Sequence, residues 1–198
     1  MRVLFGLFLC LLLASCAATG GDDASPEAVR AAAFVPSGPP KLTLLTVVNN
    51  KSGAGAHTAL VVTSSEQVIF DPAGSFRRPD VAERGDVLYG MSPAWVQGFK
   101  SAHARNTYHV VSQEIEVTPE QAALALQLVK INGAVGSAFC TNATSSVLRQ
   151  IPGFQDVKVT FFPANLMEQI AQRPDVVMTK YFENDAGDIV DGVSGVQI

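Results

Sequence analysis

Two residues that could form a nucleophile and its base, Cys140 and His57, lie far apart in this chain. Cys140 follows Gly136-Ser-Ala-Phe, where a turn is expected to run directly into a helix. A cysteine in the first turn of a helix feels the positive end of the helix dipole, which lowers its pKa and enriches the reactive thiolate. His57 opens the strand-like run Ala56-His-Thr-Ala-Leu-Val-Val and could serve as the base. The two residues therefore predict a thiol nucleophile activated by histidine.

Each of these residues also has a purely structural interpretation. Free cysteines are among the most buried residues, so Cys140 could be an inert packing residue. A histidine on an apolar strand, such as His57, is commonly a core residue with satisfied hydrogen bonds. His103 and His109 are expected on a helix surface and on a strand. The three histidines lack the spacing of metal ligands, so we expect no metal ion and no other cofactor.

The first 15 residues have the anatomy of a secretory signal peptide. Arg2 supplies the positive charge, an apolar core follows, and Ala14-Ser15 are the small residues before a cleavage site. The apolar core is too short to span a bilayer. The run Leu13-Ala-Ser-Cys resembles a bacterial lipobox, which implies that Cys16 is acylated and becomes the first mature residue. An ordinary secretion signal with a chance cysteine is the alternative.

Acylation of Cys16 would also fix the compartment. Acyl chains contribute about 0.8 kcal/mol per buried methylene, so two or three chains anchor a protein stably. Ala17 stands where an aspartate is associated with inner-membrane retention, so the resemblance to Gram-negative lipoproteins favours the outer membrane, facing the periplasm. Cys10 lies in the signal peptide, which leaves Cys140 as the one free thiol in an oxidising compartment.

Size and charge limit the domain count and the partners. The mature chain has enough residues for one domain with a full core, and we expect a monomer. Loss of Arg2 with the signal peptide changes the formal net charge from −4 to −5, and the sequence contains no cluster of lysine or arginine. Nucleic-acid binding is therefore disfavoured, and so is electrostatic attachment to anionic lipid.

Hydrophobic periodicity and turn residues predict one α+β domain over residues 41–182. The Pro- and Gly-containing residues 16–40 read as a lipidated flexible tether, and the acidic residues 183–198 as a loose tail. Helix starts are predicted at Ser92-Pro93, at the capping sequence Thr118-Pro-Glu-Gln and near Cys140. Further elements are expected as strands over 42–49, 57–63, 67–71, 107–117, 157–162 and 176–182, and as a helix over 163–172.

The order of the candidate residues carries a family resemblance. Papain-like enzymes normally place the cysteine before the histidine, whereas here His57 comes first, Asp71 follows on the next strand and Cys140 comes last. This order resembles the circularly permuted NlpC-type papain-like superfamily, which includes lecithin:retinol acyltransferase-like proteins. The motifs are Ala56-His-Thr-Ala-Leu-Val-Val, Val68-Ile-Phe-Asp-Pro-Ala-Gly and Phe139-Cys-Thr-Asn. The resemblance implies an antiparallel sheet packed against the cysteine-bearing helix.

The resemblance also implies roles for individual residues. Cys140 would attack a carbonyl as thiolate, His57 would protonate the leaving group, and Asp71 would orient the imidazole. Asp71-Pro-Ala-Gly is also a turn sequence, and Gln67 and Asn142 are alternatives for the third position. In a tight two-residue hairpin Asp71 would point away from His57, and only a longer loop or a bulge would bring the two together.

Two classes of function follow from these residues. The first is a lipid-anchored envelope thiol hydrolase or acyltransferase that cleaves an amide, ester or thioester of a cell-wall peptide or acyl substrate. The second is a non-catalytic envelope lipoprotein that uses the same fold to bind a partner or ligand. The backbone amide of Cys140 would contribute to an oxyanion hole, with Tyr108 and Asn142 as candidate side-chain donors. Serine hydrolysis lacks support because the sequence has no Gly-x-Ser-x-Gly motif.

Overall fold

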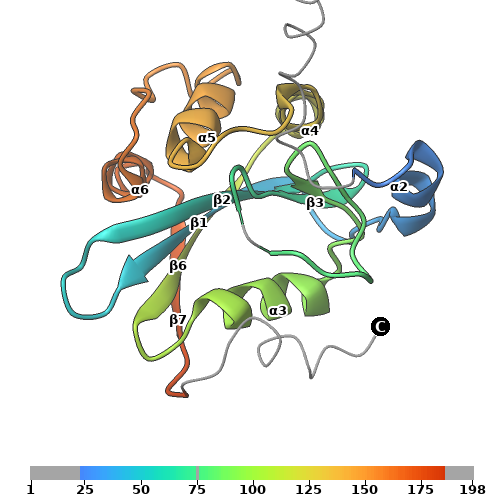
Figure 1. Cartoon of the computed structure of the whole chain (residues 1–198). Helices are drawn as coiled ribbons and strands as arrows, with labels where there is room; N and C mark the ends of the chain where they lie inside the picture. Colours follow the sequence, from blue (N-terminus) through green and yellow to red (C-terminus); the bar gives the residue numbers. More distant parts are fainter. Residues whose placement is uncertain (1–22, 75, 186–198) are drawn as a thin grey trace, which may run out of the picture.

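The computed structural model describes residues 23–74 and 76–185. Within them, one antiparallel sheet has the strand order β4-β5-β3-β2-β1-β6-β7 (Figure 1). The strands are β1 (Lys41–Asn49), β2 (Gly55–Thr63), β3 (Gln67–Phe70), β4 (Glu83–Arg84), β5 (Val87–Leu88), β6 (Tyr108–Glu116) and β7 (Val177–Phe182). The helices are α2 (Pro26–Ala32), α3 (Pro93–His103), α4 (Pro119–Asn132), α5 (Cys140–Arg149) and α6 (Pro163–Ala171).

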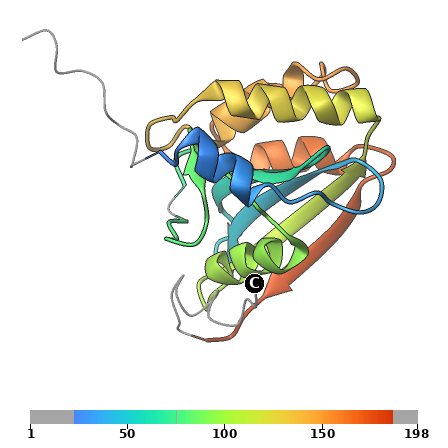
Figure 2. The ribbon, with the colours of Figure 1, turned by 90° about the vertical axis from the view of Figure 1, so that its right-hand side faces the viewer.

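Helices cover both faces of the sheet. Figures 1 and 2 show α4, α5 and α6 on one face and α3 on the other. Alternate residues of β2 divide between the two cores, because successive strand side chains point to opposite faces. Leu60 and Val62 pack with α4, α5 and α6, whereas Ala59 and Val61 pack with α3. The expected α+β class and the packing of the sheet against the cysteine-bearing helix are confirmed.

Local sequence signals account for the starts of α3 and α4. Ser92 caps α3, and its hydroxyl accepts a hydrogen bond from the backbone N–H of Trp95. Thr118 and Gln121 form a reciprocal capping box at α4. Such caps satisfy N–H groups that the first helical turn leaves without partners. Both helices therefore begin where their sequences predict.

Residues 157–162, predicted to be a strand, do not join the sheet. The segment runs without regular structure alongside α5, where Ser145 Oγ contacts the backbone N–H of Thr160 at 3.2 Å. Its position is also fixed by α6, because the Gln169 side chain accepts from the N–H of Lys158 at 2.7 Å. Side-chain groups of helices thus replace a neighbouring strand as partners for this extended backbone.

Residues 23–40, expected to belong to a flexible tether, instead pack on the domain. Asp23 Oδ1 accepts from the N–H of Gly85 at 2.9 Å, and α2 follows with partly buried side chains against the core. At the other end Glu183, expected in a loose tail, contacts Ser101 and Tyr181. The predicted signal peptide, Cys16 and the tail beyond residue 185 lie outside the described residues. No helix within the described ranges is long and apolar enough to cross a membrane.

Candidate active site

The β2–β3 hairpin brings His57 and Asp71 to the same face of the sheet. Thr63 pairs with Gln67 across the three-residue loop 64–66, and the register places Leu60 opposite Phe70. One step further, Asp71 lies opposite Ala59, and His57 is two residues along β2 on that same face. The longer loop therefore provides the alignment that a two-residue turn would have prevented.

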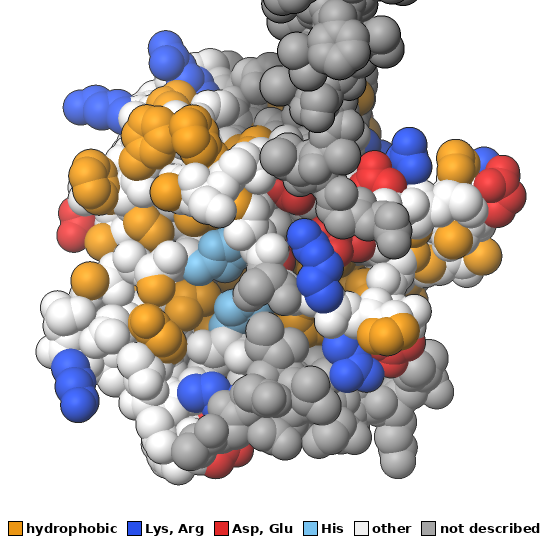
Figure 3. Space-filling view, viewed as in Figure 1, with side chains coloured by type: hydrophobic (Ala, Val, Ile, Leu, Met, Phe, Trp, Pro, Cys, Tyr) orange, Lys and Arg blue, Asp and Glu red, His pale blue; other side chains and the backbone are white. Residues whose placement is uncertain are grey.

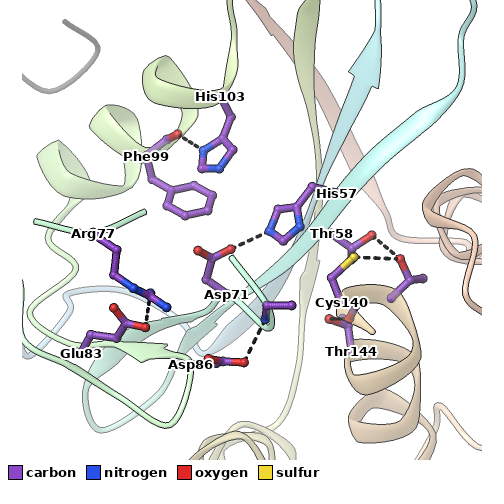
Figure 4. Close-up of polar contacts among 12 residues, drawn as sticks. His57, Thr58, Asp71, Arg77, Glu83, Asp86, Phe99, His103, Cys140 and Thr144 are labelled. Carbon is purple, nitrogen blue, oxygen red and sulfur yellow. Dashed lines mark hydrogen bonds and ion pairs between the residues drawn. The ribbon is translucent and has the colours of Figure 1, made fainter. Parts of the chain in front are cut away.

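The imidazole of His57 is bonded to a buried carboxylate. Its Nε2 lies 2.6 Å from Asp71 Oδ1, and the Asp71 side chain is only 1% exposed (Figure 4). A carboxylate held away from water requires a charged or strongly donating partner, because an unpaired buried charge is costly. The second oxygen, Asp71 Oδ2, has no hydrogen-bond partner within the described residues. His57 is therefore the principal partner of this carboxylate.

Backbone groups and a glycine fix the position of Asp71. Its N–H donates to the carbonyl of Asp86 at 2.8 Å, and the N–H of Gly74 donates to its carbonyl at 2.9 Å. A methyl group on Gly74 would lie 1.8 Å from Asp71 Oδ2, so only glycine fits there. The Asp86 carboxylate in turn accepts from the N–H of Ala73 and of Val135, both at 2.9 Å. These bonds join the Asp71 turn to the segment that leads into α5.

Cys140 is the first residue of α5 and lies beside the free edge of β2. Because β3 ends at Phe70, the edge of β2 beyond Leu60 has no strand beside it. The Cys140 Sγ lies 3.7 Å from the Thr141 hydroxyl, and the backbone of Thr58 on this edge contributes to lowering the pKa of the thiol. The Thr58 hydroxyl contacts the Thr141 hydroxyl at 3.0 Å, which ties the start of α5 to β2. In Figure 4 the imidazole of His57 lies between the Asp71 carboxylate and the Cys140 thiol.

A tight turn before Cys140 leads into α5, whose first residues Cys140 and Thr141 are buried. Ala138 has a φ of 69°, a left-handed conformation that few non-glycine residues adopt, and this turn leads directly into α5. Phe139 provides no side-chain cap for the helix. The first N–H groups of α5 therefore remain available to a ligand, and their dipole favours negative charge beside the thiol.

The surroundings favour a thiolate–imidazolium pair. Burial lowers the pKa of His57, but the hydrogen bond to Asp71 and the interaction with Cys140 outweigh it and raise the pKa to about 10. Burial raises the pKa of Cys140, but interaction with His57, Thr141 and the Thr58 backbone lowers it to about 7. Between these two values the histidine is protonated while the cysteine is ionised. Above a pH of about 7 this pairing therefore favours a thiolate beside a protonated imidazole.

His103, expected on a helix surface, lies behind the His57 ring. The two rings stack with 5.8 Å between centroids, and His103 also packs on Phe99 and Phe76. Its Nδ1 lies 2.8 Å from the carbonyl oxygen of Phe99. Burial lowers the pKa of His103, so it stays neutral at physiological pH. A neutral ring here closes one side of the His57–Asp71 pair without competing for the carboxylate.

The other predicted candidates lie elsewhere. Gln67 donates to the carbonyl of Met91 and accepts from Thr63, so it does not orient His57. Tyr108, on β6, is separated from β2 by β1. The side chain of Asn142 on α5 makes no hydrogen bond to a described residue. His109 contacts Asn50 at 2.7 Å and stacks on Phe182, consistent with the expected strand position.

Sequence reasoning missed the residues that act through the backbone or through packing. The glycine of Asp71-Pro-Ala-Gly was available as a signal, because a residue without a side chain permits close approach to a carboxylate. Asp86 and the hydroxyl pair on Thr58 and Thr141 had no comparable signal. Their partners are far away in sequence and become adjacent only in the folded chain.

Within residues 23–74 and 76–185, no group of three or more His, Cys, Asp or Glu side chains is placed to hold a metal ion.

Neither protein-family models nor curated proteins nor solved structures gave a match to this chain. The site is therefore interpreted from its own geometry.

Proposed function

We propose that the chain is a lipid-anchored envelope thiol hydrolase that cleaves an amide, ester or thioester bond through Cys140 and His57. The observation that carries the proposal is the His57–Asp71 bond of 2.6 Å beside a cysteine at the start of a helix. This arrangement also supports the proposed resemblance to permuted papain-like proteins. Acylation of Cys16 and a periplasm-facing outer-membrane location remain proposals from the lipobox alone.

The proposed reaction has two steps. The Cys140 thiolate attacks the substrate carbonyl, and free N–H groups at the start of α5 stabilise the resulting oxyanion. The His57 imidazolium gives its proton to the leaving group as the carbonyl re-forms, which leaves an acyl group on the sulfur. Neutral His57 then takes a proton from water as the hydroxide attacks the thioester carbonyl. Collapse of this intermediate breaks the C–S bond, which releases the carboxylic acid and returns Cys140 to the thiolate. Asp71 stabilises the imidazolium throughout and sets its orientation.

A small activated ester tests the proposal in place of the natural substrate. Incubation with p-nitrophenyl acetate followed by rapid acid quench should give an acetyl group on the Cys140 peptide by mass spectrometry. Cys140→Ala should abolish the adduct, and His57→Gln should slow its formation by about 10²–10⁴-fold, the usual contribution of acid–base catalysis. Absence of an adduct on Cys140, or equal turnover by Cys140→Ala, would contradict the proposal and favour a binding lipoprotein.

A further inference from the structure

Two buried threonines link the nucleophile to strand β2. Thr58, on β2, and Thr141, the second residue of α5, are both 0% exposed. Their hydroxyls lie 3.0 Å apart, and the Thr141 hydroxyl lies 3.7 Å from the Cys140 sulfur (Figure 4). Neither hydroxyl has another hydrogen-bond partner among residues 23–74 and 76–185. We call the series Thr58, Thr141 and Cys140 the hydroxyl relay.

The hydroxyl relay and His57 come from different faces of the sheet. Thr58 follows His57 in β2, so its side chain points to the opposite face, where α5 packs. Figure 3 shows histidine side chains at the molecular surface, and the His57 side chain is 16% exposed. Solvent therefore reaches the imidazole side of the site, whereas no water can replace either threonine hydroxyl.

A hydroxyl has a single proton to donate, which limits how the hydroxyl relay can be arranged. A thiolate only accepts, so the Thr141 proton must point at the sulfur when Cys140 is ionised. The Thr141 oxygen then accepts from Thr58, and both hydroxyl protons are bonded. When the sulfur is neutral, as a thiol or a thioester, Thr141 can donate to Thr58 instead. The direction of the relay thus follows the charge on the sulfur.

A buried thiolate needs such a donor. Burial raises the pKa of the Cys140 thiol, and His57, the Thr141 hydroxyl and the backbone of Thr58 lower it. A hydroxyl held at the sulfur replaces a hydrogen bond that water would give to an exposed thiolate. The present contact of 3.7 Å is long, but hydrogen bonds to an ionised acceptor are shorter and about twice as strong as neutral ones. We therefore expect the contact to tighten when the thiolate forms.

We propose that the Thr58–Thr141 pair positions a hydrogen bond on the Cys140 thiolate. The pair serves twice in the proposed reaction, because the sulfur is charged before it attacks and again when the C–S bond of the thioester breaks. While the sulfur carries the acyl group, Thr141 donates to Thr58, so neither buried hydroxyl loses its partner. Both threonines are positioning residues, and neither exchanges a proton with the substrate. The inference rests on the proposed thiolate of Cys140.

The pH dependence of Cys140 alkylation tests the hydroxyl relay. The full chain is treated with iodoacetamide at each pH, and mass spectrometry of the Cys140 peptide gives the labelling rate and the pH midpoint of ionisation. Thr141→Val removes the donor and keeps nearly the same shape, whereas Thr141→Ser keeps the hydroxyl. Thr144→Val is the matched control, because Thr144 is equally buried on α5 and its hydroxyl donates at 2.9 Å to the carbonyl of Cys140, not to the sulfur.

We expect Thr141→Val to raise the midpoint by about one to two pH units, the shift that corresponds to one hydrogen bond to a charged group. Thr141→Ser and Thr144→Val should leave the midpoint nearly unchanged. Thr58→Val should raise it by less than Thr141→Val does. The double variant Thr58→Val/Thr141→Val should show only the shift of Thr141→Val, because Thr58 acts through Thr141.

A midpoint that either single valine variant of the relay leaves unchanged would overturn the proposal. An equal rise in Thr144→Val would also overturn it, because the effect would then belong to the packing of α5. A shift in the double variant equal to the sum of the two single shifts would contradict the serial arrangement. If the unmodified chain itself titrates at the ordinary thiol value of about 8.5, both the relay and the proposed ion pair are wrong, whereas a low midpoint that the valine variants do not move refutes the relay alone.

Discussion

Replacing Asp71 by asparagine removes the negative charge that keeps His57 protonated while leaving a side chain of nearly the same shape. Two unit charges about 4 Å apart interact by about 4 kcal/mol at an effective dielectric constant of about 20. At about 1.36 kcal/mol per unit of pKa, loss of this attraction lowers the pKa of His57 by about three. Burial, which already lowers the pKa of this imidazole, acts in the same direction.

The change in protonation is large at pH 8.5. With a pKa of about 10, His57 in the unmodified chain is about 97% protonated at this pH, and in Asp71→Asn only about 3%. Nitrogen NMR of histidine-labelled protein measures this directly. His103 and His109 have lowered pKa values and stay neutral at pH 8.5, so a single imidazolium signal is expected.

The matched control is Asp156→Asn, because Asp156 pairs with Arg173 on the surface, and this variant should keep the imidazolium signal. Persistence of the signal in Asp71→Asn would refute the electrostatic reasoning. A neutral His57 in the unmodified chain at pH 8.5 would also refute it.

Three further predictions follow from contacts around the site. Gly74→Ala forces the Asp71 carboxylate to move, since the new methyl group would lie 1.8 Å from Oδ2, and the same NMR signal should weaken at pH 8.5. Gly55→Ala should lower the urea unfolding free energy by about 1–3 kcal/mol through overpacking against α6. Gly136→Ala, with no atom within 4 Å of the added methyl, should be nearly neutral, and equal costs for both would contradict the packing argument. Between pH about 7 and 9 the pair should not make the free energy of unfolding of the unmodified chain depend on pH. Unfolding takes one proton from the His57 imidazole and adds one to the Cys140 thiol, so the number of bound protons stays the same. In Cys140→Ser no thiol takes up the proton that His57 loses on unfolding. The free energy of unfolding of this variant, measured by urea titration, should therefore fall relative to the unmodified chain by up to about 1.4 kcal/mol for each unit that the pH rises over this range.

Elements with their own local signals could be predicted from the sequence. The caps at Ser92 and Thr118 satisfy helical N–H groups regardless of the rest of the fold, and both helices start as expected. The β2–β3 hairpin was also predictable, because two short apolar runs flank the polar loop of residues 64–66. The face of the sheet on which Asp71 lies could not be predicted as firmly. It depends on whether the loop has two or three residues, because a shift of one residue in the pairing moves every side chain of β3 to the other face.

Features that depend on distant contacts could not be predicted. The apolar alternation of residues 157–162 is typical of a strand, yet helix side chains, not a neighbouring strand, complete its hydrogen bonds. His103 lies on a helix as expected and is half-buried, but its stacking on His57 and Phe76 could not be predicted because both are distant in sequence. Residues 23–40 look flexible by composition, but Asp23 finds a partner in Gly85. Each outcome was decided by a contact between segments distant in sequence.

The central claim is that His57 and Cys140 form an ion pair, and the ionisation of the Cys140 thiol tests it most directly. Thiolate absorbance in the far ultraviolet, followed against pH, should give a midpoint of about 7 in the unmodified chain. In His57→Ala the midpoint should exceed the ordinary thiol value of about 8.5, because burial then acts without the imidazolium. The same midpoint in both proteins, at or above the ordinary value, would contradict the ion pair and with it the proposed thiol chemistry.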